Sequence, residues 1–349
     1  MTFCDFMHAA LYDRELGYYN SAQLEIGPKG DYYTSSNVHP AFGVMLAKMF
    51  AGFASGRFEH WTLVEMGPGT GQLACDVLSS LRDNHPSVFE HLTYILVETS
   101  PALQARQQNK LVDFVKHVRW CELADLDPSS ITGIVFSNEF IDALPVHRVR
   151  YFSGNLEEQY VAASGTGEGP LLSLVWGEPS TGRLNEELER MGVRLREGQV
   201  VEIQLAAIDW LARAADALNE GLIITIDYGD ISQLLYAPDR HRGTLRSFFR
   251  HRLVDSPLER PGKQDITASV NFSSLIDYGR GLGLEMVSYE RQSAFLIRMG
   301  LIELIADEQT PVPTQVDINS RLALKNLFVP GGVSDNFRVL IQRKVSGKS

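Results

Sequence analysis

Carboxylate and amide side chains stand at an unexpected place in the stretch FSNEFIDALPVHR. An apolar run of strand length, ITGIVF, leads directly into Asn138, Glu139 and, three residues later, Asp142. If a helix begins at Asn138 or Glu139, the two acids share one face and could form a two-acid clamp for a cationic ligand. Alternatively, Asn138 is an N-cap and both acids favour the positive end of the helix. The two interpretations are compatible, and Pro145 is expected to end this short helix.

A further acid, Asp227, lies near the end of the apolar run GLIITIDYGD. If both runs are parallel strands, they end at the carboxyl edge of one sheet, where open α/β folds bind their ligands. We therefore predict that Glu139, Asp142 and Asp227 are catalytic residues and that Asn138 contacts a cofactor.

The stretch VEMGPGTGQL places Gly67, Gly69 and Gly71 directly after another short apolar run. A dinucleotide-binding fingerprint requires glycine where this chain has Gln72, and the Gly-Lys-Ser/Thr of a phosphate-binding loop is absent. The pattern acid-x-Gly-x-Gly-x-Gly after a strand resembles the S-adenosyl-L-methionine loop of Rossmann-like methyltransferases; a tight turn without a ligand is the simpler alternative. Glycines let the backbone approach the amino-acid part of that cofactor, where a Cβ atom would collide. The sequence thus predicts S-adenosyl-L-methionine and disfavours a nicotinamide-dependent oxidoreductase.

Polar side chains beside other predicted strands are assigned to the same cofactor. Glu65 precedes the glycines, where it can order the loop or attract the cofactor's ammonium group. Glu98 ends the next run and can accept hydrogen bonds from both ribose hydroxyls, and Glu122 follows a third run, where it contacts adenine or is solvated. Thr34 and Ser35, in the polar stretch GDYYTSS, either cover the cofactor as a lid or form an ordinary turn.

Apolar runs of strand length alternate with helical patterns along most of the chain. This alternation predicts an α/β fold with a mostly parallel sheet covered by helices on both faces. Strands are expected at 62–66, 92–98, 117–123, 131–138 and 221–230, with the last two within 284–296 and 337–344, and helices at 3–12, 41–53, 72–83, 101–114, near 298–306 and at 318–328.

The predicted strands also suggest how the chain is divided. The core is expected to consist of residues 61–146 and 200–349, because the alternating pattern lies there. Residues 147–199 alternate with period two between turn residues, which indicates a β-hairpin insertion, and 231–280 form a further insertion on the substrate side. Residues 1–60 supply N-terminal helices and the loop that covers the cofactor.

Composition narrows the classes of function. The formal net charge of −11 argues against a nucleic-acid-binding protein, which must offset phosphate repulsion. Three cysteines without a CxxC pair, and histidines without ligand spacing, indicate a reducing compartment and no metal site. The N-terminal stretch lacks a basic leader, and no apolar run reaches the roughly 18 residues of a membrane span. A cytoplasmic location without membrane insertion is therefore expected.

Several longer stretches together resemble one family. They are GDYYTSSNVHPAFG, VEMGPGTGQL, LVETSPALQARQ, SNEFIDALPVHR, IDYGD and GTLRSFFRHRLVDSPLERPGKQDITASVNF. In this order they are similar to the successive blocks of the MidA-like methyltransferases, which include the mitochondrial complex I assembly arginine methyltransferase. The resemblance runs from about Phe3 to Arg343, nearly the whole chain.

The resemblance implies a Rossmann-like methyltransferase with a seven-stranded sheet and inserted substrate-side segments. It implies methyl transfer to a protein side chain, arginine above all, with a respiratory complex subunit as a candidate partner. Asp265 and Thr267 belong to the family block. Two departures bear on the substrate: the family has an acid where this chain has Asn37, and His and Asp where it has Ser269 and Asn271.

Three hypotheses remain open from the sequence. The first is a protein methyltransferase, and the second is a small-molecule methyltransferase with a deep closed pocket. The third is an assembly chaperone that binds the cofactor without turnover, which the uncharged Asn37, Ser269 and Asn271 motivate. The sequence gives neither the methyl acceptor, nor the degree and symmetry of methylation, nor the oligomeric state.

Overall fold

The computed structural model describes residues 1–21, 39–165, 171–250, 252–306 and 336–345. The predicted lid residues Thr34 and Ser35, the departure at Asn37 and the helix expected at 318–328 lie outside these residues.

The centre of the molecule is a mostly parallel sheet, as the alternating pattern predicted. Its strands run in the order β14-β15-β9-β4-β1-β2-β3, and the short β13 pairs with β9 as an eighth strand. Neighbours from β9 to β3 are parallel, whereas β15 is antiparallel to both β9 and β14. The strands are β1 (Trp61–Met66), β2 (Leu92–Val97), β3 (Val118–Cys121), β4 (Ile131–Asn138), β9 (Leu218–Asp230), β13 (Val270–Asn271), β14 (Glu285–Arg291) and β15 (Phe337–Lys344).

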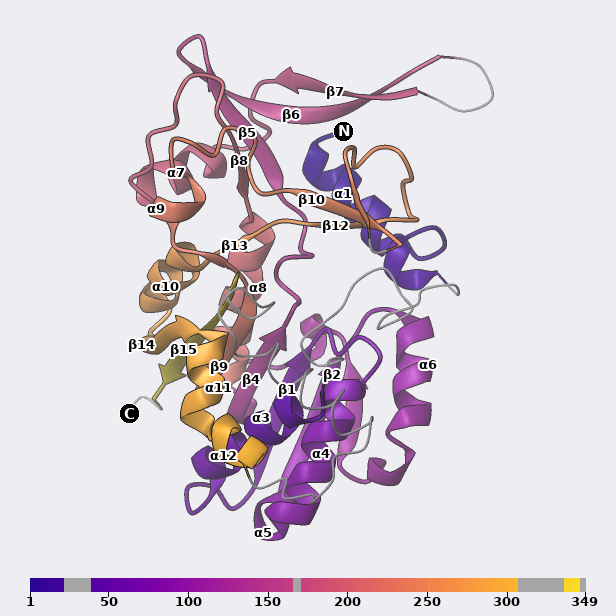
Figure 1. Cartoon of the computed structure of the whole chain (residues 1–349), viewed down its shortest axis with the longest axis vertical. Helices are drawn as coiled ribbons and strands as arrows, with labels where there is room; N and C mark the ends of the chain where they lie inside the picture. Colours follow the sequence, from indigo (N-terminus) through magenta and orange to yellow (C-terminus); the bar gives the residue numbers. More distant parts are fainter. Residues whose placement is uncertain (22–38, 166–170, 251, 307–335, 346–349) are drawn as a thin grey trace.

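Helices cover both faces of this sheet because the central strands are apolar on both sides. In β4, Ile134 and Phe136 pack with one set of helices, and Val135, which points the other way, packs with the second set. The first set is α3 (Ala41–Ala54), α4 (Gln72–Asn84), α11 (Gln292–Met299) and α12 (Leu301–Ala306), and the second is α8 (Leu205–Ala217) and α10 (Phe272–Gly281), as Figure 1 shows.

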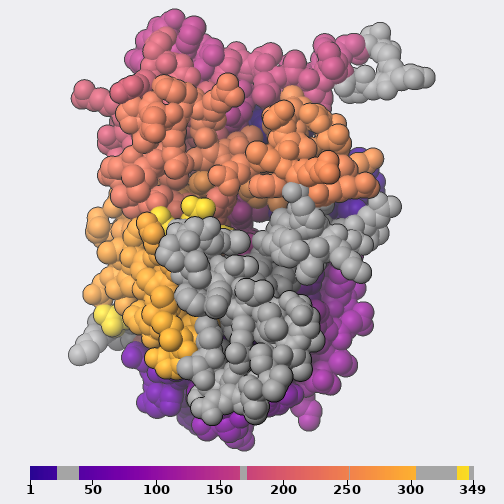
Figure 2. Space-filling model, viewed as in Figure 1, coloured from indigo at the N-terminus to yellow at the C-terminus, as the bar shows by residue number. Residues whose placement is uncertain are grey.

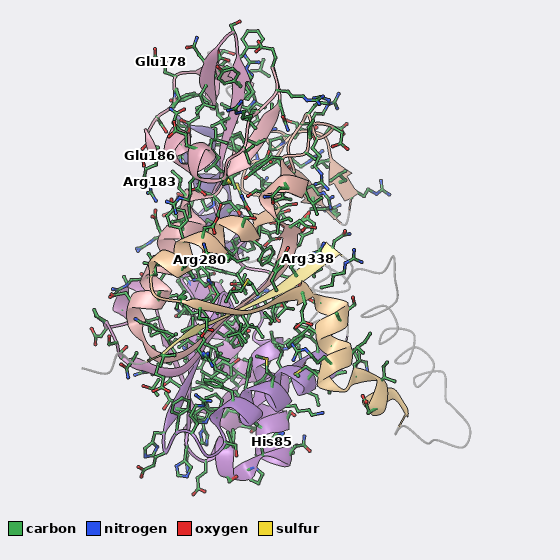
Figure 3. All side chains as sticks on the ribbon, turned by 90° about the vertical axis from the view of Figure 1, so that its left-hand side faces the viewer. His85, Glu178, Arg183, Glu186, Arg280 and Arg338 are labelled. Atoms are coloured by element: carbon green, nitrogen blue, oxygen red, sulfur yellow. The ribbon has the colours of Figure 1, made fainter. Side chains whose placement is uncertain are left out.

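A separate antiparallel sheet forms the insertion at the top of Figure 1. Its order is β7-β6-β5-β8, with α7 (Arg183–Arg190) beside it; in Figure 3, Glu178, Arg183 and Glu186 mark this end and His85 the opposite end of the molecule. The expected boundary at residue 200 shifts, because β8 pairs with β5 of the insertion. The strands are β5 (His147–Phe152), β6 (Asn155–Ser164), β7 (Leu171–Gly177) and β8 (Val200–Ile203).

The N-terminal helix α1 (Phe3–Tyr12) packs against this insertion, with Phe3 and Met7 in one apolar cluster with Val146 and Val161. Its N-terminus is anchored by a capping box between Thr2 and Asp5. The expected unit of residues 1–60 is therefore divided, since α1 belongs to the insertion side and α3 to the core. A short 3-10 turn, η1 (Tyr18–Asn20), follows α1.

A three-stranded sheet in the order β11-β10-β12 forms the second insertion. Figure 2 shows the orange residues of this region on the surface between the pink insertion and the core. The expected end of this segment at residue 280 is too late, because α10 already packs on α8 in the core. The elements are α9 (Ser232–Leu235), β10 (Arg246–Phe249), β11 (Arg252–Val254) and β12 (Asp265–Thr267).

Other expected boundaries change in smaller ways. The strand expected over 284–296 ends at Arg291, and the apolar residues that follow form α11. The helix after β2 is α6 (Pro101–Lys110), with Ser100 as N-cap and Pro101 at its first position. The remaining short turns are α5 (Pro86–Phe89), η2 (Val112–Phe114) and η3 (Leu123–Asp125).

Candidate functional site

The glycine loop connects β1 to α4 at the carboxyl edge of the sheet. Gly67, Gly69 and Gly71 have φ angles of 60°, 54° and 75°, in the left-handed region that favours glycine. A Cβ atom on Gly67 would lie 2.6 Å from Cδ2 of Phe140, and one on Gly71 would lie 3.2 Å from Cγ of Gln107. Both conformation and space therefore require glycine here, as a loop that brings its backbone close to a ligand requires.

Glu98, which follows β2, is buried and held by several donors. Its Oε1 accepts from the Ser100 N–H at 2.8 Å, and its Oε2 accepts from Nε2 of Gln107 at 3.1 Å. Burial raises the pKa of Glu98, and these hydrogen bonds oppose the rise. The carboxylate is thus fixed beside the glycine loop.

Gln107 joins the glycine loop to Glu98, and the sequence analysis missed it. Its Nε2 also donates to the Gly69 carbonyl at 2.7 Å, while its Oε1 accepts from Nε1 of Trp120 at 2.9 Å. The side chain is fully buried. A signal was present, because Gln107 lies midway between Leu103 and Leu111 on the buried face of α6, where an amide needs partners.

Glu65 lies beneath the loop. Its Oε2 accepts from the Tyr94 hydroxyl at 2.7 Å, and only 3% of the residue is exposed. Burial raises the pKa of Glu65 to about 7, with the Tyr94 hydrogen bond acting in the opposite direction. The carboxyl is positioned by Tyr94, and its interaction with a cofactor stays a prediction.

Glu122 has a local task. It is exposed, and its side chain accepts from the Asp125 N–H while Asp125 accepts from the Glu122 N–H, so that the two form a capping box on η3. The predicted contact with adenine stays untested.

The helix expected at Asn138 or Glu139 does not form, and the chain makes a turn instead. Glu139 has φ of 51°, so it breaks the helical path directly after β4. Glu139 and Asp142 therefore share no helical face, and the N-cap interpretation of Asn138 is wrong as well. The turn brings the two acids together by another route.

Asp227 holds this turn. Its Oδ2 accepts from three successive backbone N–H groups, those of Phe140, Ile141 and Asp142, at 3.2, 2.8 and 3.3 Å. Its Oδ1 accepts from the Tyr228 N–H at 2.8 Å, and the residue is fully buried. All of these bonds are internal to the protein, so we interpret the predicted catalytic Asp227 as a positioning residue.

Asp142 lies in a cluster of acids from distant segments. Burial raises its pKa well above the usual range, and the negative charges of Asp227, Asp265 and Glu139 raise it further. Asp265 comes from β12, and its Oδ1 accepts from the Tyr19 hydroxyl at 3.0 Å. The acids predicted from the sequence are thus joined by Asp265, which the family resemblance brought in.

Tyr12 lies between the acids and the cofactor side. Its hydroxyl donates to the Ala143 carbonyl at 3.0 Å, and burial and the charges of Asp265, Asp142 and Glu98 all raise its pKa. Tyr12 and Tyr19 also contact each other, with ring centroids 5.4 Å apart. The sequence analysis missed both tyrosines, since nothing in the local pattern relates residues 12 and 19 to residues 142 and 265.

The two described departures from the family pattern differ in environment. Ser269 hydrogen-bonds the side chain of Tyr228, whose ring lies 5.2 Å from the Arg246 guanidinium. Asn271 is buried and structural, because its Oδ1 accepts from the Ser274 N–H as N-cap of α10 and from the Ser232 hydroxyl. The uncharged residue at position 271 therefore suits its task.

Asn138 supplies an unfilled polar atom at this edge. Its Nδ2 donates to Oε1 of Glu139 at 3.3 Å, and only 9% of the residue is exposed. Among the described residues its Oδ1 is buried without a hydrogen-bond partner. An orphaned acceptor beside a left-handed glycine loop fits a ligand with donor groups, as the ammonium and hydroxyls of S-adenosyl-L-methionine are.

No group of three or more His, Cys, Asp or Glu side chains suited to a metal ion occurs in the described ranges. Within the same part of the chain, no helix is both long and apolar enough to cross a membrane.

Comparison with known proteins gives consistent relatives. A family model of S-adenosyl-L-methionine-dependent methyltransferases matches residues 41–289. The protein arginine methyltransferase NDUFAF7 homolog of Caenorhabditis elegans is 30% identical over 304 residues, which cover 79% of this chain and 67% of that protein. Human NDUFAF7, also named a protein arginine methyltransferase, is 26% identical over 334 residues, which cover 86% of this chain and 70% of that protein. The chain thus spans about two thirds of the length of these relatives.

A solved structure from Burkholderia thailandensis, with bound S-adenosyl-homocysteine, superposes with a TM-score of 0.86 at 28% identity. The match covers 100% of this chain and 89% of that chain. The relatives from nematode, zebrafish and human are all named as mitochondrial proteins. The cytoplasmic location expected from the sequence is therefore wrong by this comparison.

Proposed function

This chain belongs to the MidA-like family of S-adenosyl-L-methionine-dependent methyltransferases, and from that premise we propose that it methylates an arginine side chain of a protein. The cofactor, the enzyme class and the Rossmann-like core are as the sequence predicted. The acceptor is the part that requires argument.

The observation that carries the proposal is the position of Tyr12. It lies within electrostatic reach of Glu98, beside the glycine loop, and of Asp142 and Asp265 on the other side. Acids that repel one another at a buried site are stabilised by a cation that binds among them. A guanidinium meets this need, because it keeps its positive charge and donates paired hydrogen bonds to carboxylates.

The cofactor supplies an electrophilic methyl group on a sulfonium sulfur. The glycine loop and Asn138 Oδ1 are the groups of this chain that would hold it, together with Glu65 and Glu98. Phe140 connects this side to the acids, since it packs on Gly67 and begins the turn that carries Asp142. The protein's main contribution is orientation, because a methyl transfer in line depends on how the nucleophile is held.

The acids also solve the proton problem of this reaction. A guanidinium is a poor nucleophile while fully protonated, so a proton must leave as the new N–C bond forms. Asp142 has a raised pKa and is therefore a stronger base than an exposed aspartate. We assign proton acceptance to Asp142, orientation of the guanidinium to Glu139 and Asp265, and positioning of the turn to Asp227.

The chaperone hypothesis loses part of its support. Asn271 caps a helix, and its amide also contacts the Tyr236 hydroxyl, so the missing charge at 271 removes nothing from the site. Ser269 keeps a polar contact with Tyr228. A respiratory complex subunit is the first protein acceptor to assay, because of the family resemblance.

The test combines cofactor binding with methyl transfer. Full-length protein and labelled S-adenosyl-L-methionine are incubated with mitochondrial proteins, and the labelled amino acid is identified by mass spectrometry after hydrolysis. We expect labelled methylarginine. Asp142→Asn should lower transfer at least about 100-fold while calorimetry shows unchanged cofactor affinity.

Asp83→Asn is the matched control, because Asp83 is exposed and pairs with Arg82 far from the site. It should keep both activities. Label on another amino acid would overturn the arginine assignment, and label confined to small molecules would favour the second hypothesis. Cofactor binding without transfer to any acceptor would favour the chaperone.

A further inference from the structure

A second cluster of reactive side chains lies away from the methyltransferase site, where α1 packs on the insertion sheet. It consists of Cys4 on α1, His147 at the start of β5 and Glu158 on β6. Nδ1 of His147 lies 2.7 Å from Oε1 of Glu158, and the other ring nitrogen side is in hydrogen-bonding reach of the Cys4 thiol. A nucleophile, a base and an orienting carboxylate in this order are the arrangement that activates a thiol.

Each member of the cluster is fixed by its surroundings. Glu158 is completely buried, and its Oε2 accepts from the Ser180 N–H at 2.5 Å, so its position is set independently of His147. His147 is largely enclosed, with 14% of its side chain exposed. Cys4 is held by the apolar neighbours Phe3 and Met7 of α1 in their shared cluster.

The charges favour a protonated His147. Burial acts against protonation, but the hydrogen bonds with Cys4 and Glu158 outweigh it and raise the pKa of His147 to about 9. The hydrogen bond from His147 likewise outweighs burial at Glu158 and lowers its pKa. A positive imidazolium therefore faces the Cys4 sulfur at neutral pH, at the same end of α1 where the helix dipole favours an anion.

Other charged groups on the adjoining elements are engaged elsewhere. Asp5, the next residue of α1, forms the capping box with Thr2. Arg148, the next residue of β5, donates to Glu202 of β8 and to Gln159 of β6. These contacts leave His147 as the cation that acts on the sulfur.

We propose that Cys4 is a reactive thiol that forms mixed disulfides with low-molecular-weight disulfides, with His147 as its activating partner and Glu158 as the group that orients His147. The Cys4 sulfur attacks one sulfur of the reagent, a new S–S bond forms, and the original S–S bond breaks. The departing thiolate takes the proton held on the imidazolium. Neither an additional oxidant nor the methyltransferase cofactor takes part.

The chain contains its own controls. Cys75 and Cys121 are partly buried like Cys4 but lack a histidine partner among the described contacts. Burial raises the pKa of both thiols, and the nearby negative charges of Asp76 and Asp125 raise them further. At similar exposure the three cysteines differ mainly in local charge.

The experiment follows reaction of the full chain with 5,5′-dithiobis(2-nitrobenzoate), and peptide mapping assigns the rate to each cysteine. At pH 6.5 we expect Cys4 to react at least about tenfold faster than Cys75 and Cys121. His147→Gln should slow Cys4 about tenfold at pH 6.5 but much less at pH 9.5, where solvent supplies the thiolate. Glu158→Gln should have an intermediate effect.

Equal rates for the three cysteines, or a Cys4 rate that His147→Gln leaves unchanged, would overturn the proposal. If His147→Gln does not fold by circular dichroism, the wild-type pH profile decides the question. Cys4 must then lose reactivity less steeply than Cys75 and Cys121 as the pH falls. Cys4→Ser should abolish the fast phase and leave the other two rates unchanged.

Discussion

The two halves of the methyltransferase site are built in different ways. The cofactor half comes from one continuous stretch, in which the glycine loop, Glu98 and Gln107 follow one another over two strand-helix units. The acceptor half comes from four segments: Tyr12 and Tyr19 near the N-terminus, the turn after β4, Asp227 on β9 and Asp265 on β12. A local motif can be recognised without the fold, whereas the acceptor half exists only when the fold is complete.

The halves also differ in how their carboxylates are stabilised. Glu98 receives donors from residues within ten positions of it, Ser100 and Gln107. Asp227 instead holds N–H groups more than eighty positions away. Disrupting the second kind of contact should therefore have the larger effect on the whole molecule.

Asp227→Ala should give the largest effect. It leaves three buried N–H groups without an acceptor, and we expect the free energy of unfolding to fall by about 3 kcal/mol. Urea denaturation followed by circular dichroism measures this change. Asp227→Asn, which keeps one acceptor oxygen, should lose less, and Asp209→Ala, at an exposed pair with Arg183, should lose almost nothing. A loss as small for Asp227→Ala as for Asp209→Ala would remove Asp227 from its positioning role.

Glu65→Gln tests the cofactor half through pH. Below pH 4.5 Glu65 is protonated in the folded and unfolded states; between pH 4.5 and about 7 only the unfolded state ionises, which favours unfolding. Wild-type stability should therefore fall relative to Glu65→Gln over this window, by about 3 kcal/mol in all, and the difference should be constant at higher pH. Glutamine can still accept from Tyr94, so the variant isolates the charge. Parallel pH profiles for the two proteins would contradict the shift.

The comparison explains what the sequence could predict. The glycine loop and Glu98 were found because a turn after a strand needs glycine and because parallel strands end at one edge. The helix at Glu139 was wrongly expected because spacing alone cannot show that a distant carboxylate, Asp227, takes the N–H groups of a turn. The same carboxylate was assigned a catalytic role for its position, while its hydrogen bonds depend on tertiary structure.

Residues that join segments were the hardest to predict. Tyr12 and Tyr19 had no local signal, since their partners Ala143 and Asp265 lie more than one hundred positions away. The division of the chain shifted for a similar reason, because β8 joins β5 in a pairing that its four residues do not encode alone. Gln107 could have been found, since a polar residue on an apolar helical face requires buried partners.

Gly71→Ala should give a moderate effect confined to the cofactor half. The left-handed φ of 75° and the contact with Gln107 are both unfavourable to a Cβ atom. We expect a stability loss of about 1 kcal/mol and about tenfold weaker binding of S-adenosyl-L-methionine by calorimetry. Gly56→Ala is the matched control, because Gly56 has φ of 67° and open space around its Cβ position. It should lose similar stability and keep full affinity, and equal affinity losses would show that the Gln107 contact does not matter.

Tyr19→Phe should give the smallest effect and separates the halves most finely. The hydroxyl donates to Asp265 on the acceptor side, whereas the Tyr19 carbonyl accepts from the Ser100 hydroxyl at the N-cap of α6 on the cofactor side. Phenylalanine removes the first contact and keeps the second. We therefore expect kcat/KM for methyl transfer to fall about three- to tenfold, with cofactor affinity unchanged.

Tyr151→Phe is the matched control, because its hydroxyl donates to the Gly154 carbonyl at an exposed hairpin and should not affect either quantity. If Tyr19→Phe weakens cofactor binding as much as it slows transfer, the hydroxyl acts on both sides. The two halves would then be one coupled unit through Tyr19, and the difference in their construction would not be a difference in function.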